Sequence, residues 1–166
     1  MPDGSKSGDR SSNDEAAVTD SFLRRYIGYR MKRAYVHIHN SAQAAIEGFG
    51  MRITTSSALH VIVENPDLSQ SQLCLALNIE RSRAVLLVDE LEKLGLVKRN
   101  RVPQDRRSYA LRATPAGEAL FEKISARLAS QEDTVLATLS AAEKAQLAEL
   151  LDKVERGAAC ARDGVV

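Results

Sequence analysis

The sequence predicts a mainly α-helical protein that carries a single basic β-hairpin, and three observations support this fold class. Only 4% of the 166 residues are aromatic and none is tryptophan, which suits a helical protein better than a β-sandwich. Apolar residues recur at steps of three and four along most of the chain, which is the spacing of helices. Past the middle of the chain, two short stretches typical of strands flank a turn. The length fits one domain, or one domain with a helical arm.

The hairpin is predicted from the basic segment between Leu96 and Leu111. Residues 97–101 and 108–112 are expected to be its two strands, and residues 102–107 the turn that joins them. From Lys93 to Arg112 the chain concentrates cations against a single acid, Asp105, although its net charge is only +1. These cations are Lys93, Lys98, Arg99, Arg101, Arg106, Arg107 and Arg112. Such a local concentration indicates an anionic partner rather than a protein that coats nucleic acid generally.

The N-terminal residues 1–18 are predicted to be a disordered arm, because they are rich in polar residues and poor in apolar ones. They contain no apolar core of a signal peptide, and no run in the chain approaches the roughly 20 apolar residues that cross a membrane. The sequence therefore predicts a cytoplasmic protein. Its two cysteines, Cys74 and Cys160, lie far apart and predict neither a disulfide framework nor a metal site.

A long helix is predicted for residues 21–49, and it ends where glycine can take the left-handed conformation, at residues 48–50. At about 40 Å it is longer than a small domain needs, so part of it is expected to pack on another subunit. Between residues 21 and 46 it carries cations and no acid; these are Arg24, Arg25, Arg30, Lys32 and Arg33. They form either a solvated face or a site that attracts an anionic ligand.

Two further helices are predicted after this one. Ser56 or Ser57 opens the first of them, and Pro66 ends it. The next begins at Ser69, whose hydroxyl can accept from the backbone of Gln72 while the Gln72 side chain returns to the backbone of Ser69. This reciprocal arrangement is a capping box, which marks a helix start.

The helix that starts at Ser69 is short and is expected to end near Leu77, with a turn at Asn78. Another helix follows from Arg81 to Leu94 and stops at Gly95. Its expected buried face consists of Ala84, Leu87, Val88, Leu91 and Leu94. Two short helices joined by a tight turn and followed by a basic hairpin form a winged helix-turn-helix.

Two helices are predicted at the C-terminal end. Thr114 caps the first and Pro115 occupies its first position. Its apolar stripe is Phe121, Ile124, Leu128 and Val135. Ser140 and Glu143 form a second capping box, which opens a last helix. That helix is striped by Leu147, Leu150, Leu151 and Val154, and residues 157–166 are expected to be a flexible tail.

With these elements in order, residues 21–154 closely resemble the MarR family of winged-helix transcriptional regulators. The likeness is densest between Leu73 and Gly117. It rests on the run Leu91–Val97 that closes the helix before the hairpin, on Pro103–Ser108 at the tip of the wing, and on Thr114–Gly117 at the next helix start.

The resemblance implies a single domain over residues 19–156. Within it, residues 54–113 form the DNA-binding lobe, and residues 20–49 and 115–156 form dimerisation helices. The resemblance also implies an obligate homodimer with two recognition helices that face successive major grooves. The expected partner is therefore a pseudo-palindromic operator in double-stranded DNA, and no cofactor, metal ion or membrane is expected.

The helix from Arg81 to Leu94 is expected to enter the major groove at its N-terminal end. Its expected DNA contacts are Arg81, Ser82, Arg83, Val85 and Leu86. Val85 and Leu86 depart from the family, in which polar residues are usual here, and are expected either to touch thymine methyl groups or to be buried. Asp89 and Glu90 would be repelled by DNA, so the C-terminal half of the helix is expected to tilt away.

In the wing, Asp105 and Arg107 match an Asp-x-Arg pattern that family members place at the minor groove. Arginine suits a narrow minor groove because the electrostatic potential there is strongly negative. Asp105 is expected to orient the guanidinium of Arg107, or else only to cap the turn. The other DNA contacts expected in the wing are Arg99, Arg101 and Arg106.

Family members commonly bind a small aromatic or anionic effector between the DNA-binding lobe and the dimer helices. The residues expected to line such a site are Tyr26, Tyr29, Arg30, Arg33, His37 and His60. Aromatic rings and cations suit an aromatic carboxylate or its coenzyme A thioester, as in the branch of the family that controls aromatic-acid catabolism. Alternatively these side chains are dimer packing and surface. The predicted function is a repressor that releases its operator when the effector binds.

Three other classes of protein fit the sequence less well. An enzyme is not predicted, because His37 and His39 point to different sides of a helix and His60 has no neighbouring metal ligand. The alternative function is a regulator of the same fold that senses oxidants through Cys74 or Cys160, although Cys74 occupies an apolar helical position where a small buried residue is expected. A helical dimer that does not bind DNA is disfavoured by the charge of the wing.

Overall fold

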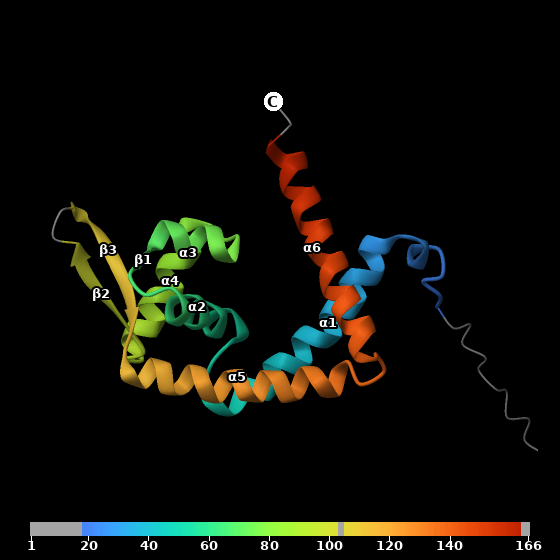
Figure 1. Cartoon of the computed structure of the whole chain (residues 1–166), viewed down its shortest axis with the longest axis horizontal. Coiled ribbons are helices and arrows are strands. Elements are labelled where there is room, and N and C mark those ends of the chain that lie inside the picture. The colour runs from blue at the N-terminus through green and yellow to red at the C-terminus, as the bar shows by residue number, and fades with distance from the viewer. Residues whose placement is uncertain (1–17, 103–104, 164–166) are drawn as a thin grey trace, which may run out of the picture. The chain divides into compact units, whose positions relative to one another are not determined.

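The computed structural model describes the backbone of residues 18–102 and 105–163, and the side chains of residues 18–101 and 109–158. Most described elements are helices, and a small antiparallel sheet accompanies them (Figure 1). The predicted fold class, a mainly helical protein with a winged helix-turn-helix, is confirmed. The arm predicted for residues 1–18 lies outside the described residues except for its last position.

The chain divides into two compact units, residues 1–35 and residues 36–166. The helix α1 (Ile27–Ile46) runs across the boundary between these units. Each unit is described by itself.

The N-terminal unit contains a short 3-10 helix, η1 (Leu23–Arg25), and the first turns of α1. The prediction of one continuous helix from residue 21 was wrong at its beginning, because Tyr26 has an extended backbone (φ −92°, ψ 127°) that separates η1 from α1. The Tyr29 hydroxyl donates to Asp20 Oδ2 over 2.9 Å. In a continuous helix these residues would lie on opposite sides and about 13 Å apart along the axis. The break therefore allows this hydrogen bond to form.

Between α1 and α2 the chain turns where the sequence predicted a break. A second 3-10 helix, η2 (Glu47–Phe49), follows α1, and Gly50 then adopts a left-handed conformation with φ +68°. An L side chain is strained at this backbone angle, which explains the glycine.

Helix α2 (Ile53–Glu64) begins earlier than the predicted start at Ser56 or Ser57. The side chain of Gln43, on α1, supplies the cap: its Oε1 accepts from the backbone N–H of Ile53 over 2.8 Å, and its Nε2 donates to the carbonyl of Met51 over 3.3 Å. Because this cap comes from a residue ten positions earlier, no local capping pattern could show it.

The helix-turn-helix follows its sequence pattern closely. Helix α3 (Gln70–Leu77) starts at the predicted capping box, in which Ser69 and Gln72 bond reciprocally. It ends at Asn78, which is left-handed with φ 50°, as a tight turn requires. Helix α4 (Arg81–Lys93), the predicted recognition helix, follows, and Gly95 reverses the chain with φ +71°.

The sheet has three strands in the order β1-β3-β2, all antiparallel: β1 (Leu68–Ser69), β2 (Val97–Val102) and β3 (Asp105–Ala113). The predicted two-stranded wing is therefore incomplete, since β1 pairs Leu68 with Leu111 on the far side of β3. A strand of two residues has no alternating pattern of its own and exists only because β3 offers a free edge. The two wing strands are also longer than predicted, and the register shifts between Arg101 and Val102.

The core lies among α2, α3, α4, the sheet and α5. Helix α2 is central to it, because it packs against α3, α4, α5 and β3. Its large, fully buried aliphatic side chains are Ile46, Leu59, Ile62, Leu73, Val88, Leu91, Leu111 and Ile124. Burial of each contributes about 1.5–3 kcal/mol to folding. The predicted buried face of α4 is confirmed except at Leu94, which caps the helix end and remains 51% exposed.

Helices α5 (Pro115–Val135) and α6 (Ala141–Asp163) follow the sheet. Both predicted starts are confirmed: the Thr114 hydroxyl accepts from the Gly117 N–H over 3.1 Å, and Ser140 and Glu143 bond reciprocally. Helix α6 continues to Asp163, so the first seven of the residues expected to form a flexible tail (157–166) are helical. None of the helices in the described part of the chain is both long and apolar enough to cross a membrane.

Gly117 provides a test of how α5 packs against the turn after α4. A Cβ atom at this position would lie 2.1 Å from the backbone oxygen of Leu96, which no side-chain rotation can relieve. Gly117→Ala is therefore expected to reduce the free energy of unfolding by about 1–3 kcal/mol, measured by chemical denaturation. The control is Gly157→Ala in α6, where a Cβ meets nothing within 4 Å and the helical preference of alanine should stabilise the protein slightly. Equal stability of the two variants would contradict the packing.

Candidate nucleic-acid interface

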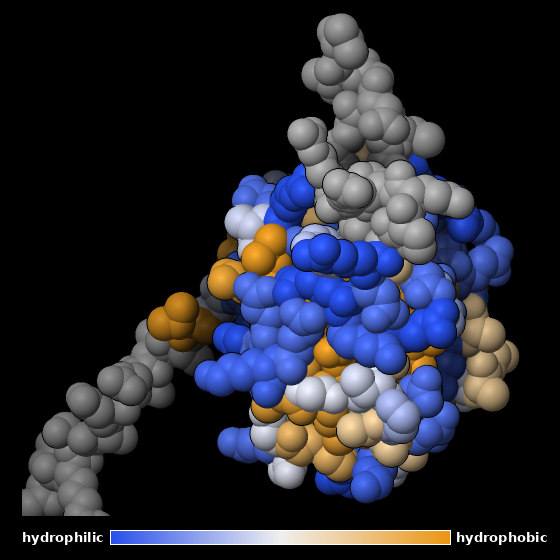
Figure 2. Space-filling view, turned by 90° about the vertical axis from the view of Figure 1, so that its left-hand side faces the viewer, coloured by the Kyte–Doolittle hydropathy of each residue, from blue (hydrophilic) through white to orange (hydrophobic). Residues whose placement is uncertain are grey.

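A groove runs between the start of α3, the exposed side of α4 and the wing. Its volume is about 550 Å³, and it is lined by Ser69, Gln70, Ser71, Arg81, Val85, Asp89, Arg99 and Tyr109. Figure 2 views the molecule from the side of the wing, and this face is mainly hydrophilic, with apolar side chains between the polar ones. The groove thus brings together three elements that the winged helix-turn-helix pattern predicts at one surface.

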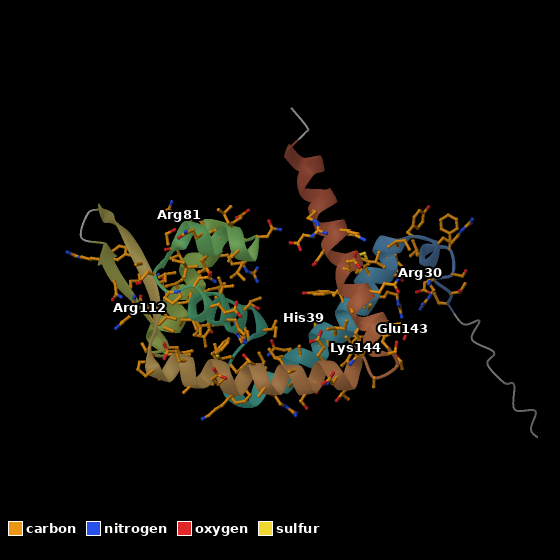
Figure 3. The ribbon with its side chains drawn as sticks, in the orientation of Figure 1. Arg30, His39, Arg81, Arg112, Glu143 and Lys144 are labelled. Atoms are coloured by element: carbon orange, nitrogen blue, oxygen red, sulfur yellow. The ribbon has the colours of Figure 1, made fainter. Side chains whose placement is uncertain are left out.

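The face of α4 toward the groove carries Arg81, Val85 and Asp89, which are four residues apart and share one side of the helix. Arg81 begins the helix and is exposed (Figure 3). Leu86 is 69% exposed, so the alternative in which it is buried against a neighbouring helix is wrong. Val85 is half-buried and lines the groove. The side chains of Val85 and Leu86 are therefore both accessible to a ligand from solvent.

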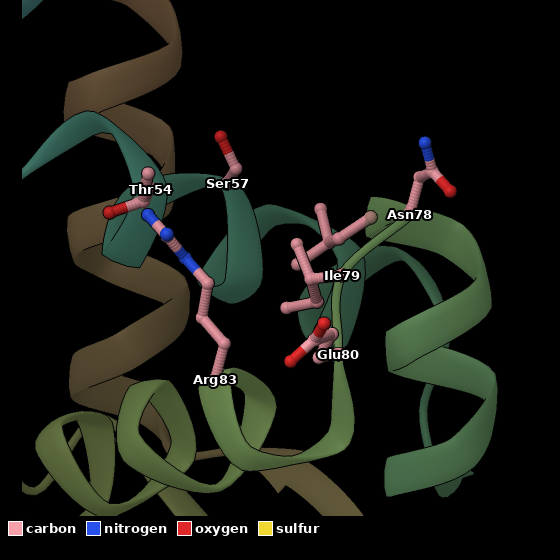
Figure 4. Close-up of a pocket in the computed structure, with 7 residues that line it drawn as sticks. Thr54, Ser57, Asn78, Ile79, Glu80 and Arg83 are labelled. Atoms are coloured by element: carbon pink, nitrogen blue, oxygen red, sulfur yellow. The ribbon is translucent and has the colours of Figure 1, made fainter.

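Arg83 faces a different pocket from Arg81. This pocket has a volume of about 430 Å³ and lies between α2 and the turn that joins α3 to α4 (Figure 4). Its lining residues are Thr54, Ser57, Leu77, Asn78, Ile79, Glu80 and Arg83. The structure therefore separates two arginines that the sequence analysis placed together as DNA contacts. Ser82, between them, is exposed.

Arg99, predicted as a DNA contact, is bonded within the protein. Its guanidinium pairs with Asp89 over 2.6 Å and with Glu92, and its backbone N–H donates to Glu92 Oε1 over 2.9 Å. Only 21% of the Arg99 side chain is exposed. Arg99 thereby fastens strand β2 to the C-terminal half of α4. Since Asp89 is neutralised by this ion pair, it repels DNA less than the sequence analysis assumed.

The second acid of this half of α4, Glu90, is also paired. Its Oε2 accepts from Arg52 over 2.8 Å and from the buried hydroxyl of Thr55 over 3.0 Å. These bonds join the beginning of α2 to α4. Both acids that were expected to tilt the helix away from DNA are therefore used to hold it in place.

The base of the wing is tied to the connection between α2 and α3. Arg112 makes two hydrogen bonds to the carboxylate of Asp67, a residue with a left-handed backbone at φ +67°. The Arg112 hydrogen bond holds the pKa of the Asp67 carboxyl below its usual range. Arg112 was counted among the wing cations, but this contact makes it a structural link (Figure 3).

The tip of the wing lies at the limit of the described residues. Arg101 is exposed on β2, opposite Tyr109 on β3. Asp105, Arg106 and Arg107 were predicted to lie in the turn, but their backbone belongs to β3. Their side chains lie outside the described residues, so their DNA contacts and the proposed Asp105 brace remain predictions.

The groove also contains polar residues that were not predicted as DNA contacts, namely Ser69, Gln70, Ser71 and Tyr109. Ser71 is exposed near the first turn of α3, and Tyr109 is 43% exposed on β3. Gln70 has a buried Nε2 without a hydrogen-bond partner, a costly arrangement that a polar ligand in the groove would relieve. The signal for Gln70 and Ser71 was available, because the helix before a recognition helix usually begins against the DNA backbone.

The residues predicted to bind an effector belong to both units. In the N-terminal unit, Tyr29 and Arg33 both contact the carboxylate of Asp20, at 2.9 and 3.3 Å. Arg30 donates to the backbone carbonyl of Arg24. Tyr26 is 57% exposed and packs edge-on against Phe22, with ring centres 6.0 Å apart; each of these contacts lies within the N-terminal unit.

In the second unit, His60 is a link between α2 and α5. Its Nδ1 donates to the backbone carbonyl of Ser56 over 2.7 Å, so Nε2 is free to accept from the Ser125 hydroxyl at 3.0 Å. Its ring also packs edge-on against Phe121, with centres 4.8 Å apart. These contacts favour the packing alternative for His60. His37 is exposed on α1.

The redox-sensing alternative gains no support from the cysteines. Cys74 is a free thiol, half-buried on α3 as its apolar position predicted. The side chain of Cys160 lies outside the described residues.

The helix-turn-helix, the three-stranded wing and the groove between them define the winged-helix class of regulators. A family model described as MarR family matches residues 49–108. A transcriptional regulatory protein for the hcr operon of Thauera aromatica is 32% identical over 157 residues, 90% of each protein. The chain belongs to the MarR family of transcriptional regulators, and its relatives are regulators rather than enzymes.

Two solved structures are similar over most of their length. The transcriptional repressor CouR bound to a 23-mer DNA duplex is 27% identical, with a TM-score of 0.79 over 83% of this chain and 98% of that chain. CouR from Rhodococcus jostii RHA1 bound to p-coumaroyl-CoA is 24% identical, with a TM-score of 0.72 over 80% and 93% of the two chains. At 24% identity, the similarity to the second structure is a similarity of fold alone.

The ion pairs of Arg99 generate a prediction about the wing. Arg99→Ala removes the cation that pairs with Asp89 and Glu92, so the free energy of unfolding is expected to fall by about 1–2 kcal/mol. Amide hydrogen exchange in β2 should become faster. Lys98→Ala, which removes an exposed cation from the same strand, is the control and should change neither quantity. Equal effects of the two substitutions would show that Arg99 contributes only charge.

Proposed function

We propose that the protein is a homodimeric repressor that binds a pseudo-palindromic operator and releases it on binding a small aromatic anion. The observation that carries this proposal is the groove, in which the start of α3, the exposed side of α4 and the wing meet. The resemblance to CouR, whose structure on a DNA duplex has the same fold, supports the same surface.

In this proposal the N-terminal half of α4 enters the major groove. Arg81 and Ser82 contact guanine edges or phosphates, and Val85 and Leu86 contact thymine methyl groups. Leu86 is 69% exposed, so its side chain is accessible to a thymine methyl group.

The wing would reach the adjacent minor groove with Arg101, Arg106 and Arg107. Arg99 would then act indirectly. It would hold β2 against α4, so that the wing and the recognition helix approach DNA as one rigid unit. Arg83, which faces the pocket beside α2, would contribute through phosphate contact or not at all.

The homodimer is proposed from the uncovered apolar face of α6. Four side chains of this face are 38–52% exposed, although each is aliphatic: Leu147, Leu150, Leu151 and Val154. They recur at steps of three and four, so they form one stripe on the helix. A stripe of this kind is covered when the same helix of a second copy packs against it, and a two-fold dimer matches a palindromic operator.

The effector is proposed to be an aromatic carboxylate or its coenzyme A thioester. Exposed Phe22 and Tyr26 offer aromatic surface, and Arg25, Arg30 and Arg33 of the same unit offer positive charge. CouR, a protein of the same fold, has been solved with p-coumaroyl-CoA, which combines both features.

DNA binding is tested by Arg81→Ala on a duplex that contains the inverted repeat upstream of the protein's own gene. Loss of a bidentate or phosphate contact should weaken binding by about 1–3 kcal/mol in fluorescence anisotropy at fixed salt. Arg127→Ala on α5 removes the same charge away from the groove and should leave affinity unchanged. If both variants bind like the unmodified protein, α4 does not enter DNA as proposed.

Dimerisation is tested by Leu151→Glu. A charged side chain in the centre of the α6 stripe should be hydrated in the monomer but buried at cost in the dimer, so the molar mass from light scattering should fall toward that of one chain. Glu155→Gln, also exposed on α6, is the control. A dimer that survives Leu151→Glu at low micromolar concentration would exclude this face as the main interface.

A further inference from the structure

The N-terminal unit contains three donors that converge on one carboxylate. Asp20 Oδ1 accepts from Arg24 Nε over 2.6 Å. Asp20 Oδ2 accepts from the Tyr29 hydroxyl over 2.9 Å and lies 3.3 Å from Arg33 Nη1. The donors come from η1 and from two positions of α1 that are one turn apart, so together they form a cradle shaped for a single oxyanion.

The backbone of this unit is arranged to keep the cradle together. The extended conformation of Tyr26 turns η1 back toward α1, and the Arg30 side chain bonds the carbonyl of Arg24 across this turn. Asp20 lies before η1, and its backbone carbonyl accepts from the Arg24 N–H over 3.1 Å. The carboxylate is thus the occupant of the cradle, whereas Arg24, Tyr29 and Arg33 are its walls.

The cradle is also only partly closed and carries excess charge. The side chains of Asp20, Arg24 and Arg33 remain 28%, 48% and 46% exposed, so solvent and solutes reach them. Arg24 is the main reason that the pKa of Asp20 lies below its usual range. Five cations stand between residues 21 and 46 without an acid, so a second anion would still be attracted while Asp20 is bound.

We infer that Asp20 is an internal competitor: it occupies an oxyanion site formed by Arg24, Tyr29 and Arg33, and a carboxylate or phosphate of the effector displaces it. This inference rests on the proposed function, in which the N-terminal unit binds an aromatic anion. It adds that binding exchanges one carboxylate for another negative group, and that the segment around Asp20 is released when the effector binds.

The exchange has a consequence for affinity. The apparent dissociation constant of a ligand equals its intrinsic constant divided by the fraction of molecules whose site is free. Removal of the Asp20 charge should therefore tighten binding, and removal of a wall should weaken it. In a site without an internal competitor, removal of a wall would still weaken binding, but removal of the Asp20 charge would tighten binding no more than removal of another nearby negative charge.

The test uses isothermal titration calorimetry on the full chain without DNA. Benzoate probes a free carboxylate and coenzyme A probes phosphate groups. Asp20→Asn is expected to tighten binding of one or both probes by about threefold to tenfold, and Arg33→Ala should weaken it. The probe that responds identifies the source of the anionic group. If neither probe binds the unmodified protein or Asp20→Asn, the inference is wrong.

A matched control separates displacement from simple repulsion. Glu15→Gln removes the same charge five residues earlier in the sequence and should leave the affinity for both probes unchanged. Equal tightening by Glu15→Gln and Asp20→Asn would overturn the inference, because only overall charge would then matter. Unchanged affinity of Asp20→Asn would overturn it as well.

Release of the segment around Asp20 is measured by amide hydrogen exchange, which reports the opening of backbone hydrogen bonds rather than affinity. The Arg24 N–H donates to the Asp20 carbonyl over 3.1 Å, so amides of residues 20–26 should exchange faster when the probe is bound. In Asp20→Asn they should already be fast without it. Slower exchange on binding would contradict displacement.

The experiments distinguish a failure of this inference from a failure of the proposed function. If Asp20→Asn tightens probe binding but no probe releases DNA, the effector role fails and the oxyanion site stands. If an aromatic anion releases DNA but Asp20→Asn does not tighten its binding, the effector role stands and the competitor is wrong.

Discussion

Arg99 lies where strand β2 passes the C-terminal half of α4, and its guanidinium is shared by Asp89 and Glu92. Its own N–H donates to Glu92 as well, so backbone and side chain are fixed together. Without this link, the recognition helix and the wing would be joined only by the turn at Gly95 and by the core beneath them. An approach to two neighbouring DNA grooves requires a fixed angle between helix and wing, and Arg99 is the residue placed to hold it.

The other ion pairs of the lobe serve the same purpose at its edges. Glu90 with Arg52 joins α4 to the start of α2, and Asp67 with Arg112 joins the α2–α3 connection to β3. Exposed pairs of this kind contribute little to stability, typically about 0–1 kcal/mol each, so their value here is geometric.

Asp20 is used in a comparable way in the N-terminal unit, where a single carboxylate gathers Arg24, Tyr29 and Arg33. The two cases differ in whether the carboxylate can be replaced by another anion. The pairs of the lobe join elements of the fold, whereas Asp20 precedes the first described helix and can leave its partners without disturbing the core. Charge pairing therefore fixes the proposed DNA-binding surface in one part of the chain, and in the other it occupies the proposed ligand site with a carboxylate that can be exchanged.

Local chemistry in the sequence determined most element boundaries: the capping box at Ser69, the left-handed turn at Asn78, and the Thr114 cap all act within four residues of one another, and the structure has each of them. The sequence also identified the wing and recognition helix, because their charge and apolar spacing are continuous along the chain. It could not give the contacts between distant residues. The Gln43 cap of α2, the strand β1, the capture of Arg99 by α4 and the separation of Arg81 from Arg83 arise from packing between elements, which only the tertiary structure decides.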